Sequence, residues 1–181
     1  MHHLLRAAVI AAGFLSGGTT AYAQTTVVLP DTSQTTDLSV SVSEQARVTV
    51  PSGVSFIVAN VGAATLANGV AVTLEQIVLA SASKQLLIAL RANASAFTPP
   101  SSGTATWAAA DVSWNAPSWT AASGAAGTLG SATFNTVATC DAGATACSTT
   151  ALLFTLAPKP SVQRSGTHIL VVTWKVESIG S

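Results

Sequence analysis

Short segments in which apolar residues alternate with serine or threonine recur along this chain. One of the clearest begins after Asp37, where Leu38, Val40 and Val42 alternate with three serines. A period of two places the apolar side chains on one face of a β-strand, whereas an amphipathic helix needs a period of about 3.6. No segment after residue 23 carries a sustained helical stripe with caps. The pattern therefore predicts an all-β fold without a long helix.

Further predicted strands follow, and turn-forming residues separate them. They are residues 47–50, 54–58, 70–79, 84–91, 104–107, 111–115, 118–120, 129–137, 151–156 and 166–177. Residues 84–91 are strongly apolar between charged ends; an amphipathic helix is the alternative there, but the β-rich neighbours and the short length favour a central strand. About eight or nine strands at regular spacing predict a single antiparallel β-sandwich of Ig-like or Greek-key type over residues 37–181. The inner half of 166–177 is apolar on both faces, which favours a central strand covered on both sides.

The first 23 residues have the features of a secretory signal peptide. Arg6 provides a positive charge, residues 7–15 form a short apolar run, and Ala21-Tyr22-Ala23 offers a cleavage site. A membrane anchor would need about 18 apolar residues, and Gly17 and Gly18 interrupt the run too early. We therefore expect a bacterial protein cleaved after Ala23, secreted or located in the periplasm or at the cell surface. The mature chain has no predicted membrane span.

Residues 24–36 form a threonine-rich N-terminal segment. It contains Pro30 and few apolar residues after Leu29. Two interpretations stay open, a loose arm or an extension that pairs with another chain.

Cys140 and Cys147 are the two cysteines of the chain. A zinc site commonly uses four Cys or His ligands, and one histidine, His168, follows the predicted signal peptide. A redox-active pair usually has the spacing Cys-x-x-Cys. In an exported protein the remaining interpretation is a structural disulfide that closes a small loop.

Composition excludes several classes of function. Only 8% of the residues are charged, and seven basic side chains balance seven acidic ones, so no basic surface for nucleic acid is expected. The carboxylates are isolated, and serine and threonine are too common to single out a nucleophile for His168. No phosphate-binding glycine motif or calcium loop occurs. We predict no catalytic residues, no metal and no cofactor, and a secreted hydrolase is the least favoured class.

Three tryptophans within thirteen residues allow a second function. Trp107, Trp114 and Trp119 are flanked by turn residues, and exposed coplanar indoles could stack on sugar rings of a polysaccharide. Tryptophan is, however, highly buried on average. A core position is therefore expected for Trp114 and Trp174, and Trp119 is expected to be the most exposed of the four.

The layout resembles bacterial exported Ig-like sandwiches of the pilin and spore-coat-U kind. The shared features are a cleaved signal, a Ser/Thr/Ala-rich surface, one small disulfide loop and a long final strand after Gly166. Pilins of that kind usually tie their first strand by a disulfide, whereas both cysteines here lie late. The resemblance therefore implies the architecture, without an expectation that subunits exchange strands.

The function predicted from these observations is non-enzymatic. We expect a surface or extracellular structural protein, a self-assembling coat or filament subunit whose partners are copies of itself or other surface proteins. The alternative is a carbohydrate-binding module that uses the three tryptophans.

Overall fold

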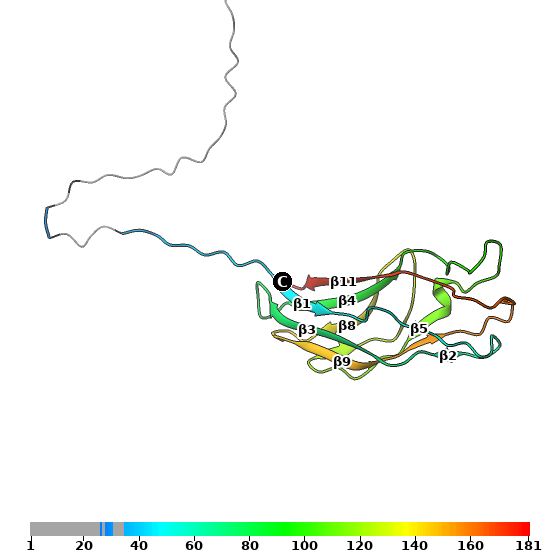
Figure 1. Cartoon of the computed structure of the whole chain (residues 1–181). Coiled ribbons are helices and arrows are strands. Elements are labelled where there is room, and N and C mark those ends of the chain that lie inside the picture. Colours follow the sequence, from blue (N-terminus) through cyan, green and yellow to red (C-terminus); the bar gives the residue numbers. More distant parts are fainter. Residues whose placement is uncertain (1–25, 27, 31–34) are drawn as a thin grey trace, which may run out of the picture. The chain divides into compact units, whose positions relative to one another are not determined.

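The computed structural model describes residue 26, residues 28–30 and residues 35–181. The predicted signal peptide, residues 1–23, lies outside the described residues, as does most of the segment 24–36. The chain divides into two units, Met1–Val40 and Ser41–Ser181. All the strands that the structure describes belong to the second unit, which is called the domain below (Figure 1).

The domain is all-β, as the alternation predicts. One short 3-10 turn, η1 (Ala109–Asp111), is the only helical element in the described part of the chain. The strands are β1 (Gln45–Thr49), β2 (Thr65–Leu66), β3 (Val70–Val78), β4 (Gln85–Ala92), β5 (Val112–Trp114), β6 (Ala122–Gly124), β7 (Gly127–Thr128), β8 (Asn135–Cys140), β9 (Cys147–Leu152), β10 (Phe154–Leu156) and β11 (Val172–Ile179). Eleven strands exceed the expected eight or nine because several are only two or three residues long.

The strands form three antiparallel sheets, β1-β3-β9, β2-β10-β5-β7 and β11-β4-β8-β6. The first two sheets are connected end to end. The chain passes from β9 into β10 with only Leu153 between them, and from β2 into β3 with only residues 67–69 between them. They make one layer, and the third sheet makes the other. This arrangement is the predicted antiparallel sandwich.

One hydrophobic core lies between the layers. Alternate residues of β4, among them Leu86, Ile88 and Leu90, are at most 5% exposed, and they face Val72 and Leu74 of β3, which are fully buried. In β3, where Val72 and Leu74 alternate with more polar neighbours, the period of two seen in the sequence is therefore the period of core contact.

The disulfide between Cys140 and Cys147 is formed, as predicted from the sequence. Cys140 ends β8 in one layer and Cys147 begins β9 in the other, and both residues are 1% exposed. The bond therefore joins the two layers across the loop between these strands.

Three expectations about strands were wrong. Residues 38–42 and 54–58 pair with no described neighbour. The last strand, β11, begins at Val172 and lies at the edge of its sheet, beside β4 only. Alternation shows that one face of a segment is apolar, but it does not show which strand lies beside it. The outward apolar residues Ile169 and Val171 remain 59% and 60% exposed.

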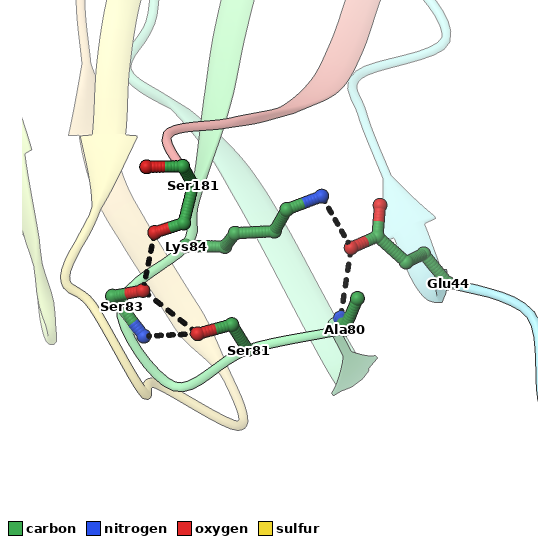
Figure 2. Close-up of polar contacts among 6 residues, drawn as sticks. All are labelled: Glu44, Ala80, Ser81, Ser83, Lys84 and Ser181. Atoms are coloured by element: carbon green, nitrogen blue, oxygen red, sulfur yellow. Dashed lines mark hydrogen bonds and ion pairs between the residues drawn. The ribbon is translucent and has the colours of Figure 1, made fainter.

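A polar network fixes the start of β1. The carboxylate of Glu44 accepts hydrogen bonds from the Lys84 ammonium at 2.9 Å and from the backbone N–H of Ala80 at 2.8 Å (Figure 2). In the same turn between β3 and β4, the hydroxyl of Ser83 donates to the carbonyl of Ser181 at 2.6 Å. The turn thus holds both the entry into β1 and the C-terminal residue.

Among the described residues, no helix is long and apolar enough to cross a membrane.

Candidate interaction site

The domain has an extended segment that covers the core without pairing with a strand. In residues 50–58, Val54, Phe56 and Val58 are half-buried against the core, and Ser55 and Ile57 point outward. This is the alternation of a strand. Yet no backbone hydrogen bond joins this segment to another described residue. Its amide and carbonyl groups are free to pair with an added chain.

The opposite wall is formed by residues 165–174. Ile169 exchanges backbone hydrogen bonds with Thr98 at 2.8 and 3.0 Å, and β11 pairs with β4. These bonds occupy one edge of the segment. The other edge carries no hydrogen bond to a described residue, because β11 ends its sheet. Two strand edges that lack partners therefore border the same space.

An apolar groove separates these two walls, and we call it the open groove. Its inner part is a cavity of about 300 Å³ that reaches core residues of both layers, including Leu90, Val112 and Phe154. Val172 and Trp174 of β11 line it from one side, and residues 51–54 and Phe56 line it from the other. The groove is thus an opening into the core along one side of the sandwich.

The groove becomes more polar toward the loop before β11. A cavity of about 710 Å³ continues there, lined by Trp107, His168 and residues 163–167 among others. Nδ1 of His168 lies 2.7 Å from the hydroxyl of Thr106. The Trp107 ring packs edge-on against the imidazole, with 5.2 Å between the two ring centroids. Nε2 of His168 is buried without a hydrogen-bond partner among the described residues. A catalytic triad would need a third group that orients the imidazole, and none contacts this nitrogen in the described part of the chain.

Residues 38–42, shortly before β1, carry apolar side chains that no described residue buries. Leu38, Val40 and Val42 are 94%, 90% and 68% exposed, and the intervening serines are exposed as well. The alternation predicted for a half-buried strand is present here, but the segment forms no strand and its apolar side chains are exposed.

Of the three tryptophans expected to stack on sugars in the alternative function, Trp107 and Trp114 lie inside the core. Trp107 is 5% and Trp114 is 3% exposed, and their indole N–H groups donate to the carbonyls of Ala157 and Ala125, both at 3.0 Å. Trp119 is half-buried, and its Nε1 is buried without a partner among the described residues. Buried rings have no free face for a sugar, so a stacking platform of Trp107, Trp114 and Trp119 does not form. The core position expected for Trp114 is confirmed, whereas Trp174 is only half-buried in the groove wall.

Two carboxylates of the domain have a lowered pKa. For Glu44 the main cause is the hydrogen bond from Lys84, followed by the bond from the Ala80 N–H. Burial acts to raise the pKa of Asp111, but hydrogen bonds from Lys159 at 2.9 Å and from the Ala108 N–H at 2.8 Å outweigh it. Both carboxylates are structural ion-pair partners rather than acids with a raised pKa that could donate a proton in catalysis.

The candidate site that the structure presents is thus an apolar groove beside unpaired strand edges, which sequence reasoning missed. The described residues contain no group of three His, Cys, Asp or Glu side chains suited to a metal ion. Comparisons with protein-family models, with curated proteins and with solved structures find no match to this chain.

Proposed function

We infer that this protein is an exported structural subunit that assembles by inserting an extended segment of one copy into the open groove of the next. The observation that carries the proposal is the groove itself, an opening into the core bordered by two strand edges without partners. Addition of a strand to an exposed sheet edge is a general mode of protein association, in which backbone bonds give affinity and pockets give specificity.

The segment around Leu38, Val40 and Val42 is the proposed occupant. Its apolar side chains are exposed and spaced two residues apart, as the inner face of an added strand requires. Each such side chain gains roughly 1.5–3 kcal/mol when it is fully buried. Insertion would also cover Val172, which is 40% exposed in the groove wall. Both partners therefore lose apolar surface in one step.

Chain connectivity favours a second copy over the protein's own groove. Glu44 is fixed to the turn between β3 and β4, directly before β1. Residues 38–42 would have to reverse direction at Ser43 and would then run back beside β1, whose five residues span about 17 Å. They would not reach the groove wall at Val54–Val58. The groove of another copy has no such restriction.

The late cysteines do not oppose this mode of assembly. A disulfide in the first strand is one way to fix that strand, and here the Glu44–Lys84 ion pair at 2.9 Å fixes the start of β1 instead. The disulfide that is formed joins β8 to β9 and leaves both groove walls free. Disulfide formation also agrees with the proposed location outside the cytoplasm.

Cross-linking between variants that each carry one added cysteine tests the proposal. Val40→Cys protein is mixed with Val172→Cys protein under mild oxidation, and we expect a covalent heterodimer. Ser39→Cys is the matched control, because its side chain points to the opposite face of the segment. The native Cys140–Cys147 bond is buried and should not take part. Equal cross-linking of both variants would show that the segment does not enter with its apolar face inward.

Light scattering and electron microscopy of the mature protein test assembly itself. We expect ordered oligomers or filaments for the native chain. The triple variant Leu38→Ser, Val40→Ser, Val42→Ser should be monomeric with an unchanged fold, while Ser39→Ala with Ser41→Ala should still assemble. A native chain that stays monomeric at high concentration would refute the proposal.

A further inference from the structure

The outer face of sheet β11-β4-β8-β6 carries a second cluster that the proposed function does not use. Arg91 of β4 lies opposite Thr173 of β11, and Lys175 lies opposite Ala89. These residues alternate with inward-facing Leu90 and Trp174, so they face away from the core. The cluster thus lies on a different surface from the open groove.

Phe134 holds both cations at one place. The Arg91 guanidinium carbon lies 4.7 Å from the centroid of the Phe134 ring, and the Lys175 ammonium lies 5.7 Å from it. Attraction between a cation and an aromatic face is strongest where water is partly excluded. The ring therefore positions two positive charges together without neutralising either.

Arg91 differs from the other cations of the domain. Lys84, Lys159 and Lys175 are half-buried, and each pairs with a carboxylate at 2.5–2.9 Å. Arg47 and Arg164 are exposed and therefore hydrated. Arg91 is half-buried, and among the described residues it has no carboxylate partner and its buried Nε has no hydrogen-bond acceptor. A partly desolvated charge of this kind is stabilised by an anion.

We propose that Arg91 and Lys175 form a binding site for a carboxylate of an acidic polysaccharide. A guanidinium binds a carboxylate through two parallel hydrogen bonds, and the Phe134 ring already holds the Arg91 guanidinium carbon 4.7 Å from its centroid. Next to it, Asn93 accepts a hydrogen bond from the Thr173 hydroxyl at 2.7 Å, and its amide N–H groups remain to bind sugar hydroxyls.

The charge count selects the class of ligand. Arg91 and Lys175 carry two positive charges, and Glu177, paired with Lys175, cancels one of them. A net charge of one suits a carboxylate on a single sugar ring. It does not suit a polyphosphate chain, whose binding needs several cations along the backbone. The site also lies on the outer face of a sheet rather than in a deep pocket, which suits an extended polysaccharide.

Titration of the mature protein with trigalacturonate tests this site, with maltotriose as the neutral trisaccharide of equal length. We expect saturable binding of the carboxylated sugar alone, weakened about tenfold or more in Arg91→Gln because a hydrogen-bonded charge contact is lost. Arg47→Gln is the control, since it removes an exposed cation of β1, which lies in another sheet. The triple serine variant of residues 38, 40 and 42 should bind as the native chain does, which separates this site from the groove.

Three results would overturn the proposal. They are absence of binding to trigalacturonate, equal binding by Arg91→Gln and the native chain, and tighter binding of a glutamate-rich peptide than of the sugar. If Arg91→Gln does not fold, Lys175→Gln decides, because the Lys175 side chain is 38% exposed on an edge strand. That change removes one cation and frees Glu177 to repel the anion, so binding must weaken.

Discussion

Gly127 of β7 lies directly against the indole ring of Trp114, its partner residue in β5. A Cβ added at position 127 would lie 2.4 Å from Cζ2 of Trp114. The ring cannot easily move away, because its Nε1 donates a hydrogen bond to the carbonyl of Ala125 at 3.0 Å. The indole is 3% exposed, so the pair belongs to the core.

Gly127→Ala should therefore destabilise the domain by about 1–3 kcal/mol, the usual cost of overpacking a core. Gly53→Ala is the control, since a Cβ there meets nothing within 4 Å, and a surface change should stay within about 0.5 kcal/mol. Urea unfolding of both variants measures the difference. Equal stability of the two variants would contradict this packing.

Truncation of the tryptophans separates a core role from a surface role. Trp114→Ala should cost about 3–5 kcal/mol through lost burial and a residual cavity. Trp119→Ala should cost less, because Trp119 is half-buried. Thermal melts of the two variants provide the measurement. An unchanged melting midpoint for Trp114→Ala would contradict the core position of Trp114 and favour the sugar-binding alternative.

The fold class could be predicted from the sequence because alternation reports a local property. In β3, the period of two gives Val72 and Leu74 one common face, and both residues are fully buried. The disulfide was predictable for a similar reason, since Cys140 and Cys147 are the only two cysteines. Both inferences depend on residues close together in the sequence.

The groove could not be predicted because what defines it is two strand edges that pair with no described neighbour. Leu38–Val42 and Val54–Val58 show the same alternation as paired strands, but neither has a neighbour among the described residues. Similarly, apolar residues on both faces of 166–177 suggested a central strand, whereas β11 is an edge strand. Strand neighbours are set by contacts between distant segments, and those contacts carry no short-range signal.

Removal of the disulfide should destabilise the domain without changing its topology. The bond closes a loop between residues 140 and 147, and the chain-entropy relation gives about 2–2.5 kcal/mol for a loop of this length. Cys140→Ala with Cys147→Ala avoids leaving one free buried thiol. Urea unfolding gives the loss, and mass spectrometry of the native protein with and without reductant verifies the bond. Two free thiols in freshly isolated native protein would contradict the structure.

Acid should weaken the domain through Asp111. Lys159 and the Ala108 N–H lower its pKa in the folded state, against the opposing effect of burial. The unfolded chain, with a pKa of about 3.9 for an ordinary aspartate, then binds more protons than the folded chain. Stability is therefore fully present above the unfolded pKa and is lost as the pH falls through the lowered folded pKa.

Asp111→Asn tests this contribution, because asparagine keeps the shape of the side chain and does not titrate. We expect a smaller fall in unfolding free energy between pH 5 and pH 3 than in the native chain. Glu44 also has a lowered pKa and loses stability in the same direction, so Glu44→Gln is measured beside it. The exposed Asp141 provides the control as Asp141→Asn. An unchanged acid profile in Asp111→Asn would show that the ion pair with Lys159 does not stabilise the fold.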